Sequence, residues 1–141
     1  MNRIHLNIPS DLLFERVVRA SAAELGTTMG FSDERIEDLK LAVSEAVTNA
    51  IEHGSNGGRN SVEVIFALDQ DKLEVDIIDR GSGVDSFNTE RRVVEEDNLD
   101  SGMLRGFGMY LIGELVDQYE VQSSSEGTSL KLRIFRPTPG E

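Results

Sequence analysis

Three stretches of the chain alternate hydrophobic and polar residues, the pattern of a β-strand with one buried face. They cover residues 3–8, 62–68 and 73–78. The polar residues 69–72 between the second and third stretches predict a short turn, and therefore an antiparallel hairpin. Residues 119–122 and 129–135 predict two further strands, joined by a turn in which Gly127 can adopt a positive φ.

Two helices are predicted between the first and second strands. Ser10 is a candidate N-cap for the first helix, and a breaker follows at residues 26–30. The apolar residues that recur there at helical spacing are Leu12, Leu13, Val17, Ala20 and Leu25. Ser32, followed by two acidic residues, begins a second helix that should run from about Asp33 to His53 and end at Gly54. Its apolar face consists of Ile36, Leu39, Val43, Ala46, Val47 and Ala50.

Neither hydrophobic period holds over residues 81–105, after which residues 106–117 predict a third helix. Loops longer than about 12–15 residues are uncommon in compact domains and usually have a function, so this stretch predicts a mobile lid. The order of elements predicts an α+β two-layer sandwich, with about three helices on one face of a mixed, mostly antiparallel sheet. Because no linker or repeat divides the chain, we expect residues 1–141 to form a single domain.

The composition excludes several classes of function. The chain has 26 acidic and 14 basic residues, a formal net charge of −12, which argues against direct binding to nucleic acids or to an anionic membrane surface. It has no cysteine, which excludes disulfides, thiol catalysis and cysteine zinc sites, and its two histidines exclude a histidine-rich metal site. Since the sequence shows neither a signal peptide nor an apolar run of about 18 residues, we expect a cytoplasmic protein with no membrane contact.

The second predicted helix carries a polar stripe beside its apolar face. Glu45, Asn49 and His53 are four residues apart, so they follow one another along one side of the helix. Carboxylate and amide oxygens are suitable ligands for a hard cation such as Mg²⁺. The stripe is equally consistent with a solvated polar face of a core helix.

Two glycine-containing clusters follow. Asp79 ends a strand and is followed by Arg80-Gly81-Ser82-Gly83, where an aspartate can accept a hydrogen bond from a ligand amine and glycines allow close approach. The segment Arg105-Gly106-Phe107-Gly108 precedes the third helix, and such a turn offers free N–H groups and a positive charge to an anion. Each cluster alone is also consistent with an ordinary turn. The second matches neither the dinucleotide fingerprint nor a P-loop.

In this order, the clusters resemble the ATP-binding fold shared by gyrase-type, Hsp90-type, histidine-kinase and mismatch-repair ATPases. The N box is matched by E-A-V-T-N-A-I-E-H-G, the two glycine boxes by D-R-G-S-G and R-G-F-G-M, and the terminal motif by Gly127-Thr128. The resemblance covers nearly the whole chain. For a domain of this length, it is most similar to the anti-sigma factor serine kinases of bacterial regulation.

The resemblance implies a role for each matched residue outside the glycine boxes. Glu45 would be the general base for the protein substrate, and Asn49 would bind Mg²⁺ at the phosphates. Asp79 would accept the adenine amine, supported by Thr128. Arg16, on the first helix, matches a partner-binding position, although an exposed arginine there is as consistent with a solvated surface.

It also implies roles for the glycine boxes. Gly81 and Gly83 would let the backbone close on the base, and Arg105, Gly106 and Gly108 would cradle the phosphates beneath an ATP lid at about residues 81–105.

The function implied is an ATP- and Mg²⁺-dependent serine/threonine kinase that is also an anti-sigma factor. Such a protein holds a sigma factor and phosphorylates a small anti-anti-sigma protein, and the resemblance suggests a homodimer. The alternatives are a non-catalytic ATP-binding module whose nucleotide shapes a partner-binding surface, and a structural domain that binds no nucleotide.

Overall fold

The computed structural model describes residues 1–54, 61–79, 109–124 and 127–137. Its elements along the chain are β1 (Asn2–Pro9), η1 (Leu12–Phe14), α1 (Glu15–Thr28), α2 (Asp33–Gly54), β2 (Ser61–Leu68), β3 (Lys72–Asp79), β4 (Gln118–Ser124) and β5 (Gly127–Phe135). Residues 109–115 are also helical and are called the 109–115 helix below. The predicted lid at 81–105 lies outside the described residues.

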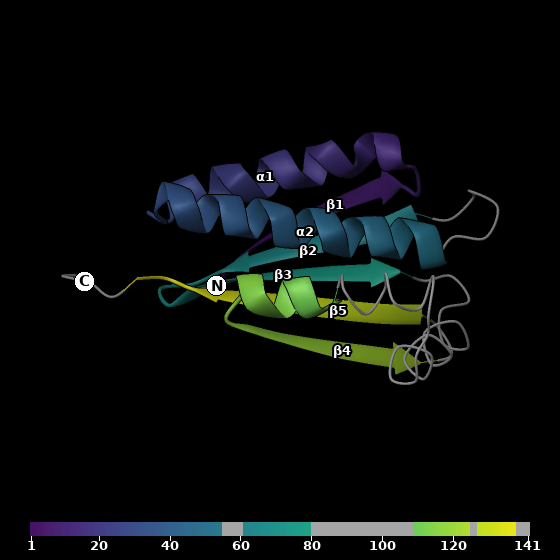
Figure 1. Ribbon diagram of the computed structural model, residues 1–141. Helices are drawn as coiled ribbons and strands as arrows, with labels where there is room; N and C mark the ends of the chain where they lie inside the picture. The colour runs from purple at the N-terminus through teal and green to yellow at the C-terminus, as the bar shows by residue number, and fades with distance from the viewer. Residues whose placement is uncertain (55–60, 80–108, 125–126, 138–141) are drawn as a thin grey trace.

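The strands form one five-stranded sheet in the order β1-β2-β3-β5-β4. All four neighbouring pairs are antiparallel, including the predicted hairpin of β2 and β3. Helices α1 and α2 and the 109–115 helix cover one face of the sheet, which confirms the predicted α+β sandwich (Figure 1). Within the described residues, no helix is long and apolar enough to cross a membrane.

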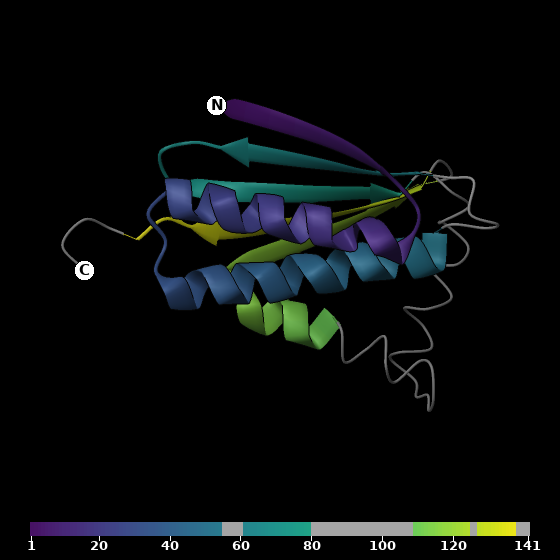
Figure 2. The same ribbon diagram turned by 90° about the horizontal axis from the view of Figure 1, so that it is seen from above.

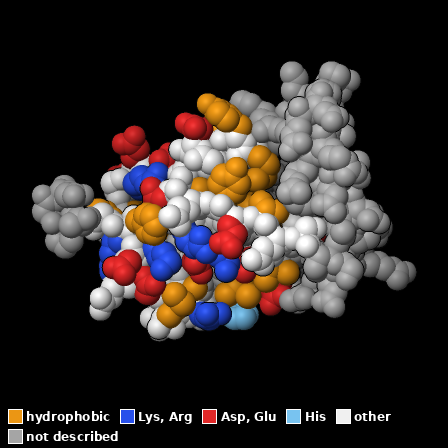
Figure 3. All heavy atoms as spheres, turned by 90° about the horizontal axis from the view of Figure 1, so that it is seen from below, with side chains coloured by type: hydrophobic (Ala, Val, Ile, Leu, Met, Phe, Trp, Pro, Cys, Tyr) orange, Lys and Arg blue, Asp and Glu red, His pale blue; other side chains and the backbone are white. Residues whose placement is uncertain are grey.

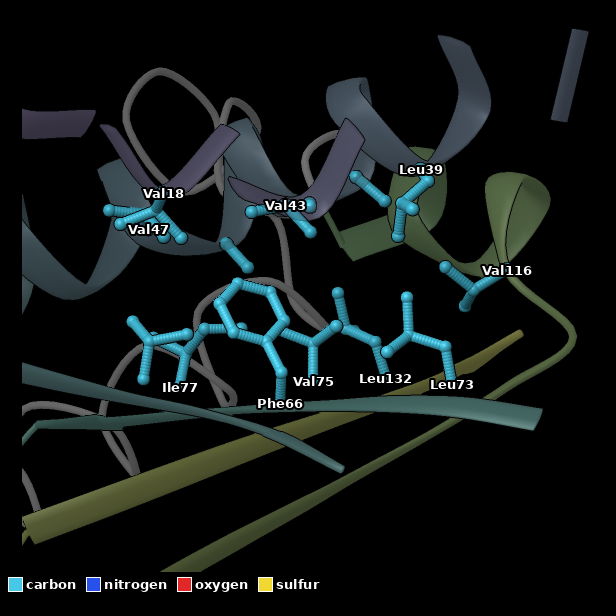
Figure 4. Packing of buried hydrophobic residues seen from close by; sticks show 14 of the residues in the cluster. Val18, Leu39, Val43, Val47, Phe66, Leu73, Val75, Ile77, Val116 and Leu132 are labelled. Atoms are coloured by element: carbon cyan, nitrogen blue, oxygen red, sulfur yellow. The ribbon is translucent and has the colours of Figure 1, made fainter. Parts of the chain in front are cut away.

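The core lies between this helical layer and the sheet. Along β3 every second residue is buried: these residues are Leu73, Val75, Ile77 and Asp79. In Figure 4, Phe66 and Val75 rise from the sheet toward Val43, and Val18 and Val47 meet above Ile77. Fully burying side chains of this size stabilises the fold by about 1.5–3 kcal/mol each.

The beginning of the first helix differs from the prediction. Ser10 is not its N-cap: Asp11 Oδ1 accepts a hydrogen bond of 2.9 Å from the Leu13 backbone N–H, and α1 begins only at Glu15. The short 3₁₀ turn η1 comes first and shifts the phase of the helix after it. As a result, the inward face of α1 consists of Val18, Ala22 and Gly26, while Leu12, Leu13 and Val17 remain 51%, 61% and 44% exposed.

The predicted break at residues 26–30 is also corrected. Gly26 is a buried helical residue, and a Cβ built there would lie 3.1 Å from Ile36 Cγ1 on α2. The helix ends at Thr28 with Met29 as its C-cap, and the turn after it contains Gly30, whose φ is +84°, and is closed by two backbone hydrogen bonds. Gly30 N donates to Thr27 O at 3.1 Å and Phe31 N donates to Gly26 O at 3.0 Å, the bonding pattern of a Schellman motif.

The second face of the sheet carries charged side chains paired across the strands (Figure 3). Arg133 on β5 donates to Glu74 on β3 at 2.8 Å and to Glu120 on β4 at 2.7 Å. The hydrogen bonds to Glu74 and Glu120 raise the pKa of Arg133. The hydrogen bond from the Arg133 guanidinium lowers the pKa of the Glu120 carboxyl. Ser129 donates to Asp76 at 2.6 Å in the same layer.

Candidate functional site

The polar stripe of α2 lies where the helical pattern predicts. Glu45 and Asn49 are both half-buried, beside the fully buried Val43 and the nearly buried Ala46. They are one helical turn apart, about 6 Å along the axis at a rise of 1.5 Å per residue. Their side chains are therefore at the margin of the core, partly open to solvent and close enough to act on one ligand.

Asp79 is the last residue of β3 and is 6% exposed. Its side chain shares the helix-covered face with Val75 and Ile77, because residues two apart in a strand point to the same side. In the sheet register it stands between Val62 on β2 and Thr128 on β5. A carboxylate is held here at the end of the sandwich with an apolar neighbour on one side and a hydroxyl on the other.

Thr128 is the second polar residue of this pair. Its Oγ1 is buried and has no hydrogen-bond partner among the described residues, an arrangement that normally costs about 1–3 kcal/mol in a folded protein. Directly opposed residues of antiparallel strands have Cβ atoms about 4.5–5.5 Å apart, so the Thr128 hydroxyl and the Asp79 carboxyl are neighbours. A carboxylate acceptor beside an unused hydroxyl fits a flat heterocycle that presents an amine next to a ring nitrogen.

The stripe and the strand end belong to the same end of the molecule. In Figure 4, Leu39 of α2 lies over the Leu73 end of β3, and Val47 lies over its Ile77 end. Helix and strand thus run in the same direction, and each continues by two residues, to Asn49 and to Asp79. The structure thus places Glu45, Asn49, Asp79 and Thr128 toward the same end of the molecule.

The remaining predicted residues divide into two groups. Gly81, Gly83, Arg105, Gly106 and Gly108 lie outside the described residues. Arg16 is exposed in the first turn of α1, among the exposed hydrophobic residues Leu12, Leu13 and Val17. We call these four residues the η1–α1 surface; sequence periodicity had placed the hydrophobic ones on a core-facing helix.

The described residues contain no group of three or more acidic, histidine or cysteine side chains able to hold a metal ion. Mg²⁺ in nucleotide sites usually takes only one or two protein ligands. The half-buried amide of Asn49 has an oxygen of the kind that could serve as one of them.

Residues 8–134 match the family described as histidine kinase-like ATPase domains. The serine-protein kinase RsbW of Bacillus velezensis is 36% identical over 132 residues, which cover 86% of this chain and 79% of that protein. RsbW of Bacillus pumilus is 35% identical over 144 residues, covering 94% of this chain and 85% of that protein. RsbW of Bacillus cereus is 30% identical over 137 residues, covering 95% and 86%.

Solved structures agree on the fold. A crystal structure of the RsbU and RsbW domains of a Mycobacterium tuberculosis protein matches with a TM-score of 0.69 and 23% identity, over 98% of this chain and 34% of that chain. The SiaB-SiaC complex from Pseudomonas aeruginosa matches with a TM-score of 0.65 and 13% identity, over 93% and 88%. At these identities the likeness establishes the architecture alone.

Proposed function

Because the chain belongs to the family of histidine kinase-like ATPase domains, together with the serine-protein kinases RsbW, we propose that it is an ATP-dependent serine/threonine protein kinase and anti-sigma factor. The observation that carries the nucleotide site is the pairing of Asp79 with the unpartnered Thr128 hydroxyl across β3 and β5. The kinase assignment adds Glu45, half-buried on the neighbouring helix.

The pair at the end of β3 and β5 recognises the base. The Asp79 carboxylate accepts a hydrogen bond from the exocyclic amine of adenine, and the Thr128 hydroxyl donates to the adjacent ring nitrogen. Guanine presents a carbonyl where adenine has its amine, so its oxygen would face the carboxylate and be repelled. The site consequently selects ATP over GTP.

Asn49 and Glu45 serve the phosphate end. Bound ATP would supply the transferable phosphoryl group, and Mg²⁺ would neutralise the charge that accumulates on it. The Asn49 amide oxygen would hold the metal, and Glu45, one turn away, would orient the substrate hydroxyl and accept its proton. By the family resemblance, Gly81 and Gly83 would serve the base and Arg105, Gly106 and Gly108 the phosphates; all five lie outside the described residues.

Two protein partners belong to this function. A sigma factor is held inactive, and a small anti-anti-sigma protein is the phosphoacceptor. The η1–α1 surface supports this part of the proposal, because Arg16 stands among three exposed hydrophobic side chains. An arginine surrounded by apolar residues is a common composition for the centre of a protein–protein interface. We further propose that the active form is a homodimer.

The experiment that tests the enzymatic assignment is single-turnover transfer of labelled γ-phosphate to a small anti-anti-sigma protein of the same organism. Glu45→Gln should lower the transfer rate by about 10²–10⁴-fold, the usual contribution of a general base. Its affinity for ATP should stay within about threefold of wild type, because the variant removes a group that acts on the second substrate.

Glu52→Gln is the matched control, since Glu52 is an exposed carboxylate on the same helix. It should leave both affinity and rate unchanged. Normal transfer by Glu45→Gln would contradict the catalytic assignment. ATP binding by wild type without any transfer would instead favour a non-catalytic module in which the nucleotide only shapes the partner-binding surface.

A further inference from the structure

Arg35, in the first turn of α2, bonds the helix to the segment before β4. Its Nη1 donates to the Leu115 backbone oxygen at 3.0 Å and to Asp38 Oδ2 at 3.0 Å. Its Nη2 donates to Asp117 Oδ2 at 3.1 Å, and that same oxygen accepts the Phe135 backbone N–H of β5 at 2.7 Å. One half-buried guanidinium therefore joins a helix, a neighbouring segment and, through Asp117, the sheet.

Residues 109–117, which Arg35 contacts, depend on tertiary contacts for their structure. The described part of the short helix covers only residues 109–115, and isolated helices shorter than about 12–15 residues are marginal in water. Its position comes from tertiary contacts: Ile112 and Val116 are buried in the core, and Arg35 bonds one of its last carbonyls. In the described parts of the chain, the hydrogen bonds that join α2 to residues 109–117 both come from Arg35.

Arg35 also lies on the same side of α2 as the proposed catalytic residues. Arg35, Asp38, Ala42, Glu45 and Asn49 follow one another at spacings of three, four, three and four residues, which forms one continuous stripe. Figure 2 shows the 109–115 helix beside α2 along its side away from α1, with the beginning of the short helix pointing toward the Gly54 end of α2.

The described part of the 109–115 helix extends along α2 from Arg35 toward the level of Glu45. At a rise of 1.5 Å per residue, Glu45 lies about 15 Å along α2 from Arg35, and the 109–115 helix extends about 9 Å in the same direction from Leu115. Its beginning is thus about one helical turn from the level of Glu45. The described part of the short helix therefore runs beside the Arg35 half of the stripe, and its residue Met109 faces the half on which ATP phosphates and metal are proposed to bind, about one turn before Glu45.

We infer that Arg35 is a positioning residue for the kinase reaction, which fixes the 109–115 helix against the side of α2 that carries Glu45 and Asn49. The inference rests on the proposed function. Arg35 touches neither nucleotide nor protein substrate; it acts through the place of the short helix. Its loss should weaken ATP binding and leave the chemical step, which depends on Glu45, nearly intact.

The test compares Arg35→Ala with wild type by steady-state kinetics and ATP titration, well below the melting temperature of either protein. We expect KM and Kd for ATP to rise about five- to tenfold and kcat to stay within about twofold. Lys40→Ala is the control: Lys40 forms an ion pair with Glu37 at 3.1 Å on the same helix, away from the short helix, and its loss should change neither parameter.

Two further variants separate positioning from simple destabilisation. Arg35→Lys keeps a donor within reach of Leu115 but loses the second arm of the guanidinium, so its KM should be intermediate. Asp117→Asn removes the charge of the carboxylate that pairs with Arg35 Nη2. Because both changes act on this one ion pair, the effect of Asp117→Asn on KM should not add to that of Arg35→Ala. These two variants give the answer if Arg35→Ala does not fold.

Folded Arg35 variants with the wild-type KM would overturn the inference, even if their melting temperature falls. Full additivity with Asp117→Asn would overturn it as well. Absence of ATP binding by the wild type is a different result: it would overturn the proposed function, and the role of Arg35 with it.

Discussion

Thr128 is a buried hydroxyl whose lack of a hydrogen-bond partner has no structural purpose. The fold does not need it, because a valine of nearly the same shape would satisfy the sheet at this position. Its place opposite Asp79 supports the proposed role in ligand recognition. The motif Gly127-Thr128 predicted the residue, but only the register of β3 and β5 showed that its hydroxyl is unused.

Thr128→Val should therefore separate binding from stability. Removing an unpaired buried hydroxyl should not lower the melting temperature. Losing one ligand hydrogen bond, which contributes about 0.5–1.5 kcal/mol, should raise the Kd for ATP by about two- to twelvefold. Thermal unfolding and ATP titration measure the two effects on the same samples.

Ser129→Ala, at the next residue, should have the opposite effects on stability and on ATP affinity. Its hydroxyl bonds Asp76 on the second face of the sheet, so this variant should lose stability and keep its affinity for ATP. If Thr128→Val binds ATP as wild type does, Thr128 has no part in recognising the base.

Arg35 shows the limit of sequence reasoning at the residue scale. Its local partner Asp38 is visible as a spacing of three residues, a common surface pair on helices. Its bonds to Leu115 and Asp117 join positions about 80 residues apart in the chain, which no local pattern reveals. Asp79, Glu45 and Asn49, by contrast, could be found because they belong to a motif.

At the scale of elements, the strands and α2 follow the sequence pattern closely, and the signal is strongest in β2, β3 and α2, whose inward faces are buried. The beginning of the first helix could not be placed, since Ser10 and Asp11 are both good N-caps. The structure uses Asp11 and inserts η1, which moves the buried face to Val18 and Ala22. Exposing Leu12, Leu13 and Val17 is unfavourable for an isolated domain, and it supports a partner at this surface.

The turn between α1 and α2 makes a prediction about stability. Gly30 has a φ of +84°, and a Cβ there would meet nothing within 4 Å, so the only penalty for a side chain is conformational. Gly30→Ala should lower the free energy of unfolding by about 1–2 kcal/mol, as measured by urea denaturation. Gly30→Asn should lose less, because asparagine tolerates the left-handed region. Equal stability of Gly30→Ala and wild type would contradict the assignment of a Schellman turn.

At the scale of the whole molecule, the two ends of the sandwich differ in what they contain. One end contains the turn after α1 and the turn between β2 and β3, and Arg136 connects them. It donates to Met29 O at 3.1 Å and to Gln70 O at 3.2 Å. The other end carries Glu45, Asn49, Asp79 and Thr128. The proposed ligand site is thus at the opposite end of the core from the turns that Arg136 connects.

The net charge of −12 also acts on the whole molecule, since it repels an anionic nucleotide. The described residues of the site do not offset it: Glu45 and Asp79 are acidic, and Asn49 and Thr128 are neutral. Magnesium is the simplest source of the missing positive charge, and ATP binding should depend on it. Composition thus bears on the mechanism of binding, beyond the classes of function that it excludes.

The measurement that tests the central claim most directly is calorimetric titration of ATP and ADP, with and without Mg²⁺, on wild type, Asp79→Asn and Asp76→Asn. Asp76 is the control, because it lies on the same strand but on the opposite face of the sheet, bonded to Ser129. We predict magnesium-dependent ATP binding that Asp76→Asn preserves and Asp79→Asn weakens about 10–100-fold, the loss of a charge-assisted hydrogen bond. Wild-type affinity in Asp79→Asn, or no binding by wild type under any condition, would contradict a nucleotide site at the end of β3.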